Sequence, residues 1–190
     1  MKRLFCSIGV PANREILEAV DSWKQNFAGQ NVKWVNPNDY HVTLKFLGET
    51  EETKMLEIIK ALENCAPKLV PFSFHVQNGG TFRKNNVPSV IWLDLLNTSG
   101  LVFLYNTINK ALRHLDYATH KTCFVPHLTI GRIKQANDTK ETQALMNRII
   151  TKQLATVRVD SFSLMESILQ AQGPKYSVVG KFLFKSGSND

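Results

Sequence analysis

Short runs of alternating or continuous apolar residues divide this chain into strand-like segments, and apolar residues at helical spacing lie between several of them. The runs predict strands over residues 4–10, 32–35, 40–47, 72–76, 90–95, 124–130, 157–165 and 176–184. Apolar residues three and four apart predict helices over 12–27, 51–65, 100–115 and 139–150. Turn-forming residues punctuate the pattern: we expect Pro11, Gly48 and Gly131 to end strands, and the pairs Gly79-Gly80 and Gly173-Pro174 to form turns.

The order of these segments indicates the fold class. Strands and helices alternate, but several strands follow one another without a helix between them, which favours antiparallel pairing. We therefore expect an α+β fold rather than a doubly wound parallel sheet. The chain has no low-complexity segment and no long linker, so we expect residues 1–190 to form a single domain, with a frayed polar tail over 185–190.

Composition excludes several classes of protein. With 43% hydrophobic residues, 21% charged residues, 10 Gly and 7 Pro, the chain is neither collagen-like nor disordered. Three cysteines (Cys6, Cys65 and Cys123) are an odd number without metal-ligand spacing, so we expect reduced, mostly buried thiols, as is typical of a cytoplasmic protein. No apolar run approaches the roughly 20 residues of a spanning helix, and residues 4–10 suit a strand better than a signal peptide.

The charge is positive. Lys and Arg total 23 and Asp and Glu total 16, which gives a net charge of +7. A positive field favours anionic ligands such as nucleic acid or phosphate esters. An excess of surface lysine that only keeps the protein in solution would give the same number.

One tetrapeptide pattern occurs twice. His41-Val42-Thr43-Leu44 and His127-Leu128-Thr129-Ile130 each lie on a predicted strand that runs to a glycine. For a chain of this composition, chance placement would give only about 0.06 tetrapeptides in which His and Thr alternate with two apolar residues. A matching pair is therefore a strong signal.

The spacing within the pattern follows from strand geometry. Side chains alternate between the two faces of a strand, so His41 and Thr43 point one way while their apolar neighbours point into the core. His127 and Thr129 are presented in the same way. If the two halves pack about an approximate two-fold axis, two imidazoles and two hydroxyls converge on one small site.

Such a site suits phosphodiester chemistry. Histidine titrates near neutral pH, so one imidazole can act as a base towards water while the other protonates the leaving oxygen. The hydroxyls of Thr43 and Thr129 would donate hydrogen bonds to the non-bridging oxygens, where charge develops. We expect no metal and no cofactor, and Arg132 and Lys45 are candidate cations.

Three other interpretations compete. His41 and His127 could be packed or surface residues, as we expect for His75, His114 and His120. They could bind zinc, but the strands offer threonines rather than further Cys or carboxylate ligands. Cys123, four residues before His127, could be a nucleophile beside its base, although an apolar filler on a strand is the simpler interpretation.

The paired motifs resemble those of the 2H phosphoesterase superfamily, and within it the RNA 2′,3′-cyclic phosphodiesterases, also called 2′-5′ RNA ligases. The likeness rests on two segments, Tyr40-His41-Val42-Thr43-Leu44-Lys45-Phe46-Leu47-Gly48 and Pro126-His127-Leu128-Thr129-Ile130-Gly131-Arg132. Flanking segments fit as well: Arg3-Leu4-Phe5, Val32-Lys33-Trp34-Val35, Ile91-Trp92-Leu93, and Glu166-Ser167 through to Tyr176. The resemblance thus covers nearly the whole chain.

The resemblance implies two pseudo-symmetric lobes, each an antiparallel sheet backed by helices, with the active cleft between the sheets. It implies metal-independent hydrolysis of an RNA-terminal 2′,3′-cyclic phosphate to a 2′-phosphomonoester, and in some members the joining of tRNA halves through a 2′-5′ linkage. His41 then corresponds to the proton donor and His127 to the proton acceptor. Thr43, Thr129 and Arg132 correspond to the groups that bind the phosphate.

Arg132 departs from the simple strand pattern. By strict alternation it shares a face with Leu128 and Ile130 rather than with His127, and only a strand end or a bulge near Gly131 would turn it towards the phosphate. Candidates for further RNA contacts are a set of aromatic residues and one basic loop: Trp34, Tyr40, Phe46, Phe82, Tyr176 and Arg83-Lys84.

The leading hypothesis is an enzyme that opens 2′,3′-cyclic phosphates at RNA 3′ ends. Two alternatives are a 2H phosphodiesterase for small cyclic or 2′-5′-linked nucleotides, and an RNA-binding module without turnover. We expect a cytoplasmic monomer whose partners are RNA ends or nucleotides with a cyclic phosphate, and no membrane association.

Overall fold

Twelve strands and helices make up most of the computed structural model, which describes residues 1–85, 87–115, 117, 124–135, 152–170 and 173–185. The three α-helices are α1 (Arg14–Asn26), α2 (Glu52–Cys65) and α3 (Ser99–Ala111), and short 3₁₀ turns lie at Pro37–Asp39, Ala66–Lys68 and Arg113–Leu115. The nine strands are β1 (Lys2–Gly9), β2 (Asn31–Trp34), β3 (His41–Thr50), β4 (Phe72–Lys84), β5 (Val87–Leu96), β6 (His127–Gln135), β7 (Gln153–Val159), β8 (Ser161–Gln170) and β9 (Gly173–Leu183).

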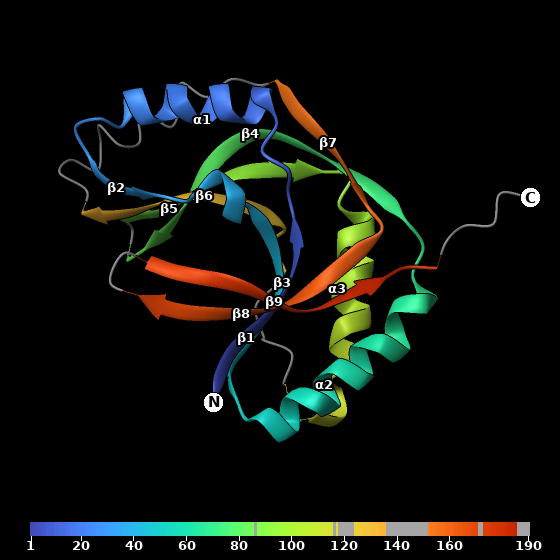
Figure 1. Cartoon of the computed structure of the whole chain (residues 1–190). Helices are drawn as coiled ribbons and strands as arrows, with labels where there is room; N and C mark the ends of the chain where they lie inside the picture. Colours follow the sequence, from blue (N-terminus) through green and yellow to red (C-terminus); the bar gives the residue numbers. More distant parts are fainter. Residues whose placement is uncertain (86, 116, 118–123, 136–151, 171–172, 186–190) are drawn as a thin grey trace, which may run out of the picture.

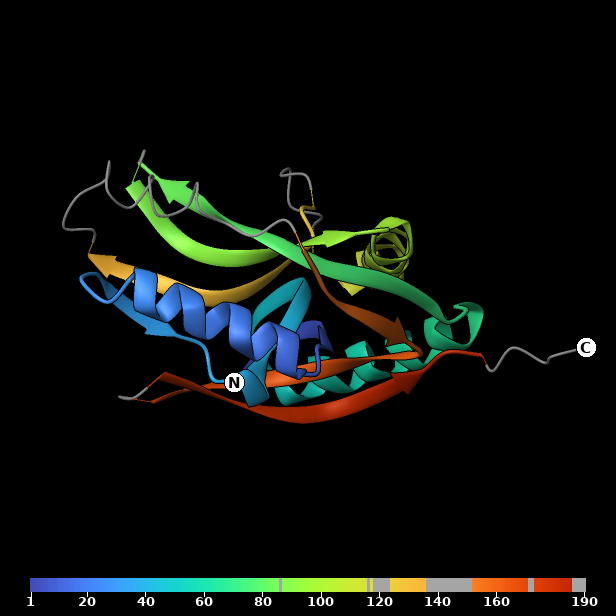
Figure 2. The same ribbon diagram turned by 90° about the horizontal axis from the view of Figure 1, so that it is seen from above.

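The strands form one antiparallel sheet in the order β7-β4-β5-β6-β3-β1-β8-β9, with β2 added to β6. A half of five strands (β7, β4, β5, β6 and β2) and a half of four (β3, β1, β8 and β9) meet where β3 pairs with β6, through Val42 and Leu128. Because this ladder is so short, the halves curve apart, as the view in Figure 2 shows. The α+β class is confirmed, and the two expected lobes are the two halves of this sheet.

Helices pack against the sheet and bury its apolar face. Helix α1 is capped by Asn13, whose side-chain oxygen accepts a hydrogen bond from the Ile16 amide at 3.0 Å, and the helix contacts β7. Helix α3 packs against β3 and β4, and α2 packs against α3 and β9, as Figure 1 shows. These three helices confirm the predictions for 12–27, 51–65 and 100–115, whereas the segment 139–150 lies outside the described residues.

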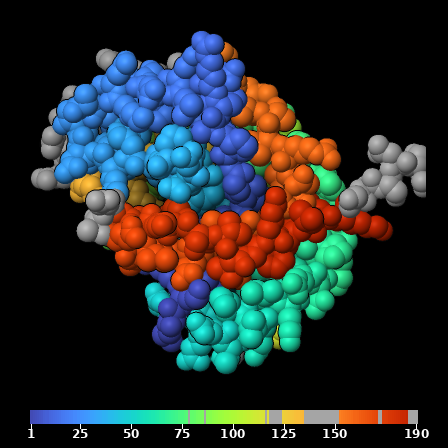
Figure 3. Space-filling view, in the orientation of Figure 1, coloured from blue at the N-terminus to red at the C-terminus, as the bar shows by residue number. Residues whose placement is uncertain are grey.

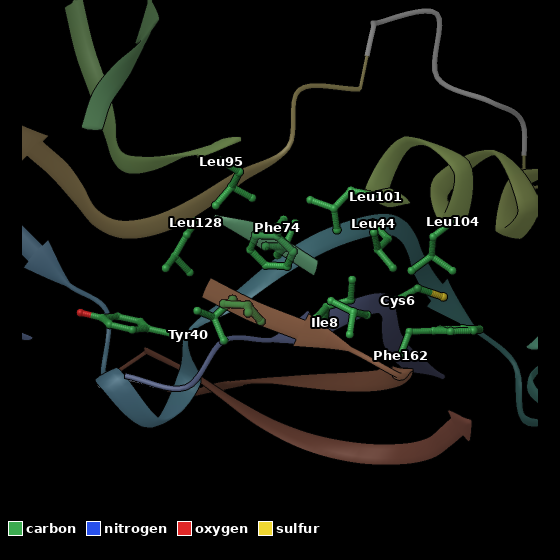
Figure 4. Close-up of a cluster of buried hydrophobic side chains, with 14 of the residues drawn as sticks. Cys6, Ile8, Tyr40, Leu44, Phe74, Leu95, Leu101, Leu104, Leu128 and Phe162 are labelled. Atoms are coloured by element: carbon green, nitrogen blue, oxygen red, sulfur yellow. The ribbon is translucent and has the colours of Figure 1, made fainter. Parts of the chain in front are cut away.

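The core forms where the apolar residues of the two motif strands meet the helices. Leu44 is buried there with Leu101 and Leu104 of α3 close by, and Leu128 is buried farther along the same core (Figure 4). The buried apolar set continues through Leu4, Cys6 and Ile8 of β1 and Phe162 of β8. The apolar positions of both motifs are therefore anchored in this core, which fixes the face that their polar neighbours occupy.

The predicted turn at Gly79-Gly80 is wrong, because β4 runs through both glycines. A Cβ atom at Gly79 would lie 2.4 Å from the Trp23 ring, and one at Gly80 would lie 2.4 Å from the Trp92 ring. The glycines thus leave room for two indoles that pack on the strand. This role depends on distant parts of the chain, so the local pattern does not reveal it.

The predicted strand 157–165 is also wrong, because the chain breaks at Asp160 into β7 and β8. The two strands lie in different halves of the sheet: β7 pairs with β4, and β8 pairs with β1 and β9. The alternation of apolar and polar residues continues across Asp160, so the sequence pattern does not reveal that the chain turns there from one strand into another.

The prediction that Gly48 and Gly131 end their strands is wrong, because both strands continue beyond them. Gly48 has a φ of 74°, which a glycine adopts without strain, and β3 continues to Thr50. Gly131 lies inside β6, where Trp34 and Val32 of the neighbouring β2 pack against it. Both glycines therefore lie at irregularities within a strand rather than at a strand end.

The two halves also touch near the tip of the β8–β9 hairpin. On the face shown in Figure 3, the blue segments of α1 and β2 lie directly above the orange and red strands β8 and β9. The Lys33 amine of β2 reaches this hairpin, since a Cβ atom at Gly173 would lie 2.6 Å from Nζ. In the described part of the chain, no helix has the length and apolar character needed to cross a membrane.

Candidate active site

The five residues predicted from the sequence line one cavity of about 720 Å³ between the two halves of the sheet. They are His41 and Thr43 of β3, and His127, Thr129 and Arg132 of β6. The structure therefore brings together two tetrapeptides that lie in different halves of the chain.

Strand alternation accounts for the position of the histidines and threonines. Val42 and Leu44 are buried, and so are Leu128 and Ile130, whereas the polar members of both motifs remain partly accessible. Val42 and Leu128 also form the pair that joins the two halves. His41 and His127 each lie one residue before this pair, so the antiparallel pairing places them close to the joint, one on either side of it.

A β-bulge turns Arg132 towards the cavity. Thr129 pairs with Trp92 and Gly131 with Ile91, so Ile130 is an extra residue on β6. The extra residue shifts the alternation by one place, and Arg132 then shares a face with His127 and Thr129. From the sequence, either a strand end or a bulge near Gly131 is required to turn Arg132 towards the other polar residues. The structure contains the bulge.

The first motif contains the matching bulge. Thr43 pairs with Ser7 and Lys45 with Cys6, so Leu44 is the extra residue on β3. Phe46 consequently occupies the place on β3 that Arg132 occupies on β6, and it too lines the cavity. The two halves share a backbone plan but place an aromatic ring at one end of the site and a cation at the other.

Each imidazole is fixed by a hydrogen bond between its Nδ1 and the backbone oxygen two residues earlier. His41 Nδ1 lies 2.7 Å from the backbone oxygen of Asp39, and His127 Nδ1 lies 2.8 Å from that of Val125. A carbonyl oxygen can only accept, so Nδ1 carries the proton in each ring. Nε2, on the far side of the ring, is left to accept or donate a proton in the cavity.

The pKa values of both histidines lie below their ordinary value. Burial is the main cause for His41 and for His127, because it disfavours the charged imidazolium. The Arg132 guanidinium lowers the pKa of each ring further, and His127 lowers that of His41. Arg132 thus lies within electrostatic range of both rings, and His127 lies within range of His41.

Asp39 distinguishes the two histidines. Its carboxylate and its backbone oxygen both raise the pKa of His41, partly offsetting burial. The corresponding residue before His127 is Val125, which contributes only its carbonyl. His41 is therefore the ring with an acidic neighbour that favours its protonated form.

Aromatic rings surround both imidazoles. Phe5 and Tyr176 lie beside His41, at centroid distances of 5.2 Å and 5.3 Å, and Phe82 lies edge-on to His127 at 4.7 Å. Tyr176, Phe82 and Phe46 thus belong to the cavity, as suggested for RNA contacts.

The other aromatic candidates serve the core instead. Tyr40 is buried, and Trp34 packs against Phe27 and Gly131. Sequence reasoning missed Phe5 and Asp39 as site residues. Phe5 appears only as part of an apolar strand, and Asp39 as part of a turn, although its place two residues before His41 matches that of Val125 before His127.

The three other basic candidates have different surroundings from Arg132. Lys45 is buried beside the cavity, where its amine donates a hydrogen bond to Asn109 of α3, and burial lowers its pKa. Arg83 and Lys84 are exposed at the end of β4. Lys45 therefore links the motif strand to α3.

The remaining histidines and cysteines of the described residues lie apart from this arrangement. His75 Nδ1 lies 3.0 Å from the Thr156 hydroxyl, and His114 belongs to a 3₁₀ turn. Burial raises the pKa of the free thiols of Cys6 to about 12 and of Cys65 to about 11. Cys123 and His120 lie outside the described residues.

The described residues hold no group of three or more His, Cys, Asp or Glu side chains that could bind a metal ion. What they do hold is a pair of imidazoles, two hydroxyls and a guanidinium facing one volume. Such a set can transfer protons at two points and bind an anion between them.

Comparison with known proteins identifies relatives over most of the chain. A family model described as "LigT like Phosphoesterase" matches residues 8–92. The chain is 30% identical over 177 residues to the RNA 2′,3′-cyclic phosphodiesterase of Methanocaldococcus jannaschii, covering 93% of this chain and 98% of the relative. It is 36% identical over 159 residues to the Thermotoga maritima protein of the same name, covering 84% and 83%.

Solved structures share the fold. A protein of Thermus thermophilus superposes with a TM-score of 0.81 at 23% identity, covering 97% of this chain and 99% of that one. Escherichia coli LigT complexed with 3′-AMP gives a TM-score of 0.75 at 20% identity, with the same coverage. The likeness in both cases extends over the whole sheet rather than over one half of it.

Proposed function

Because the chain belongs to the family of LigT-like phosphoesterases, we propose that it hydrolyses 2′,3′-cyclic phosphates at RNA 3′ ends to 2′-phosphomonoesters by a two-histidine mechanism. The observation that carries the proposal is the common placement of His41 and His127. Each ring is held through Nδ1 by a backbone carbonyl, and each lines the same cavity. Curated relatives at 30% and 36% identity bear the name of this activity.

The proposed reaction needs one base and one acid. Nε2 of His127 takes a proton from water, and the water oxygen attacks phosphorus. The bond from phosphorus to O3′ breaks, and Nε2 of His41 gives its proton to O3′, leaving the phosphate on O2′. A 5′-hydroxyl in place of water would give a 2′-5′ linkage by the same transfers, which is the ligase reaction suggested by the resemblance.

The assignment of acid and base is supported by Asp39. Its carboxylate favours the protonated form of His41, and no carboxylate is among the groups that shift the pKa of His127. An anionic phosphate in the cavity would raise the pKa of both rings, since an opposite charge stabilises the imidazolium. Of the two rings, His41 would then be the first to take up a proton at Nε2 and become an imidazolium.

Thr43, Thr129 and Arg132 complete the proposed site. Their hydroxyls and guanidinium can donate to the non-bridging oxygens, on which negative charge grows as water attacks. Arg132 also contributes a full positive charge within range of both histidines. The proposed steps require no metal ion.

The proposal includes the state of the protein in the cell. All five site residues come from one chain, so a monomer suffices. The sheet is continuous across both halves, which supports one domain over residues 1–190. Free, buried thiols at Cys6 and Cys65 are typical of a reducing compartment, and we place the enzyme in the cytoplasm.

The experiment compares three substrates. An RNA oligonucleotide with a 2′,3′-cyclic phosphate, a cyclic mononucleotide and a 2′-5′-linked dinucleotide are incubated with the protein, with and without a chelator. We expect turnover of the oligonucleotide that persists with chelator and yields the 2′-phosphate. Turnover of the small nucleotides alone would favour the alternative phosphodiesterase, and binding without turnover would favour an RNA-binding module.

A matched control separates the site from the rest of the fold. His127→Gln is expected to abolish most turnover, whereas His75→Gln, which removes an imidazole bonded to Thr156, is expected to leave it unchanged. Turnover that is lost when a chelator removes metal ions would contradict the proposed mechanism, and so would turnover that yields the 3′-phosphate.

A further inference from the structure

The carbonyl that holds His127 lies outside regular secondary structure. Nδ1 of His127 is 2.8 Å from the backbone oxygen of Val125, and β6 begins only at His127 itself. Val125 is 52% exposed and precedes Pro126, a residue without an N–H group. The strand that carries His127 therefore does not include the oxygen that orients its ring.

The corresponding carbonyl on the other side of the cavity is held locally. Asp39 ends the 3₁₀ turn Pro37–Asp39, and its amide donates a hydrogen bond to the Asn36 oxygen at 2.8 Å. The Asn36 side chain caps the turn by accepting a hydrogen bond from the Asn38 amide at 3.0 Å. Hydrogen bonds within four residues thus hold the Asp39 oxygen, whereas the second motif draws its support from elsewhere in the fold.

This support comes from α3. The ring of Phe124, the residue before Val125, stacks on the Tyr105 ring of the helix with 4.3 Å between centroids and 2° between planes. The helix is firmly seated, because Leu101 and Leu104 are fully buried in the core (Figure 4). A parallel stack on such a base holds Phe124 in place and, with it, the adjoining Val125.

A second link ties the same helix to the first motif. The Lys45 amine of β3 donates a hydrogen bond to Asn109 Oδ1, and Asn109 Nδ2 donates to the backbone oxygen of Tyr105 at 2.8 Å. Lys45 and Asn109 are both buried, so water competes little for the hydrogen bond between them. The stacked ring is therefore anchored through polar contacts to the strand that carries Thr43.

The orientation of His127 has a chemical consequence. A neutral imidazole carries one proton, and the nitrogen that lacks it is the base. The Val125 oxygen can only accept a hydrogen bond, so it keeps the proton on Nδ1 and leaves the lone pair of Nε2 to the cavity. If this oxygen moved away, the proton could reside on Nε2, and such a ring cannot take a proton from water at that atom.

We infer that Tyr105 is a positioning residue for His127: its stack on Phe124 holds the Val125 carbonyl against Nδ1 and thereby keeps Nε2 unprotonated. The inference rests on the proposed function for the role of Nε2 as a base, whereas the tautomer of the ring does not depend on that function. Tyr105 acts through its two neighbours in this chain of contacts and transfers no proton itself.

The kinetic test compares variants in α3. Tyr105→Ala removes the ring, and Tyr105→Phe keeps the stack without the hydroxyl. Phe103→Ala is the matched control, because Phe103 is 61% exposed and lines a separate pocket. With a cyclic-phosphate RNA oligonucleotide, we expect Tyr105→Ala to lower kcat about 10-fold or more and to change KM little. Tyr105→Phe should restore most of the wild-type kcat, and Phe103→Ala should leave it unchanged.

Nitrogen-15 NMR of the two histidines separates positioning from a general loss of structure. The shifts of a neutral imidazole distinguish its two tautomers. We expect both His41 and His127 of the wild type to carry the proton on Nδ1, and Tyr105→Ala to show a mixture at His127. His41 should stay unchanged, since Asp39 lies in its own turn. Signals are assigned from His41→Gln and His127→Gln. Tyr105→Leu, which keeps apolar bulk but no ring, replaces Tyr105→Ala if the latter does not fold.

Several results would overturn the inference. One is an unchanged tautomer of His127 without the Tyr105 ring, and another is an equal change in both histidines. In an active enzyme, an unchanged kcat would also refute it, and so would a loss in KM alone, which would make Tyr105 a substrate contact.

The tautomer is measured without substrate, so it also separates this inference from the proposed function. If the wild type turns over no substrate and the His127 tautomer still depends on Tyr105, the proposed function fails and the positioning role stands. If turnover is present and the tautomer does not depend on Tyr105, the positioning role alone fails.

Discussion

Arg132 lies on the same face of β6 as His127, because the bulge at Ile130 offsets the alternation between them. The guanidinium lowers the pKa of His127 and that of His41 across the cavity. One cation therefore favours the neutral form of both imidazoles.

Replacing Arg132 by Gln should change both the rate and its pH dependence. Loss of a donor to the non-bridging oxygens should lower kcat about 10²-fold or more. Since the positive charge lowers the pKa of both histidines, its removal raises both values, and both limbs of the profile of kcat/KM should move to higher pH. The measurement is kcat/KM for a cyclic-phosphate oligonucleotide across the range in which histidine titrates. Limbs that move to lower pH would refute the electrostatic role.

Titration of the histidines should reveal their environment directly. Burial lowers the pKa of His41 and His127, so NMR should find both rings neutral at pH 7 in the free protein. Inorganic phosphate at saturating concentration should raise both values by adding a negative charge between the rings. Signals are assigned from His41→Gln and His127→Gln. If phosphate leaves both titrations unchanged, the anion does not bind where we place it.

The two histidine variants should remove opposite limbs of the pH profile. Without the base, His127→Gln should lose the limb at low pH, whereas His41→Gln, without the acid, should lose the limb at high pH. Each variant should lose about 10²-fold or more in kcat while keeping its free energy of unfolding within about 1 kcal/mol of the wild type. If the limbs are exchanged between the variants, the roles of acid and base are reversed.

Gly80→Ala should destabilise the sheet next to the second motif. A Cβ atom would lie 2.4 Å from the Trp92 ring, and Trp92 pairs in register with Thr129. We expect a loss of about 1–3 kcal/mol in the free energy of unfolding, measured with urea, together with reduced turnover. Gly29→Ala is the control, because a Cβ atom there meets nothing within 4 Å. Equal stability of the two variants would show that the indole can move aside.

The parts of the site that could be predicted are those with a local cause. Alternation along a strand fixes the direction of His41, Thr43, His127 and Thr129, and it depends on neighbouring residues alone. Phe5 and Asp39 were not predicted, because Phe5 reaches His41 from another strand and Asp39 acts through a turn. Such contacts follow from the assembled sheet.

The fold, like the site, has some features with a local cause and others that depend on distant segments of the chain. Amphipathic spacing predicts the three described helices to within a few residues, since one apolar face suffices to define each. The corner at Asp160 and the bulge at Ile130 depend on which strand lies alongside, and that partner is remote in the chain. The sequence therefore indicates that Arg132 needs a bulge but not that one forms.

The joint between the halves, at Val42 and Leu128, has a mechanical consequence. When one body rocks against another about a pivot, a point moves in proportion to its distance from that pivot. The two imidazoles each lie one residue from the pivot, whereas the tips of the β4–β5 and β8–β9 hairpins lie far along their strands. Any rotation of one half against the other about this joint would therefore displace the far ends of those strands much more than the two imidazoles.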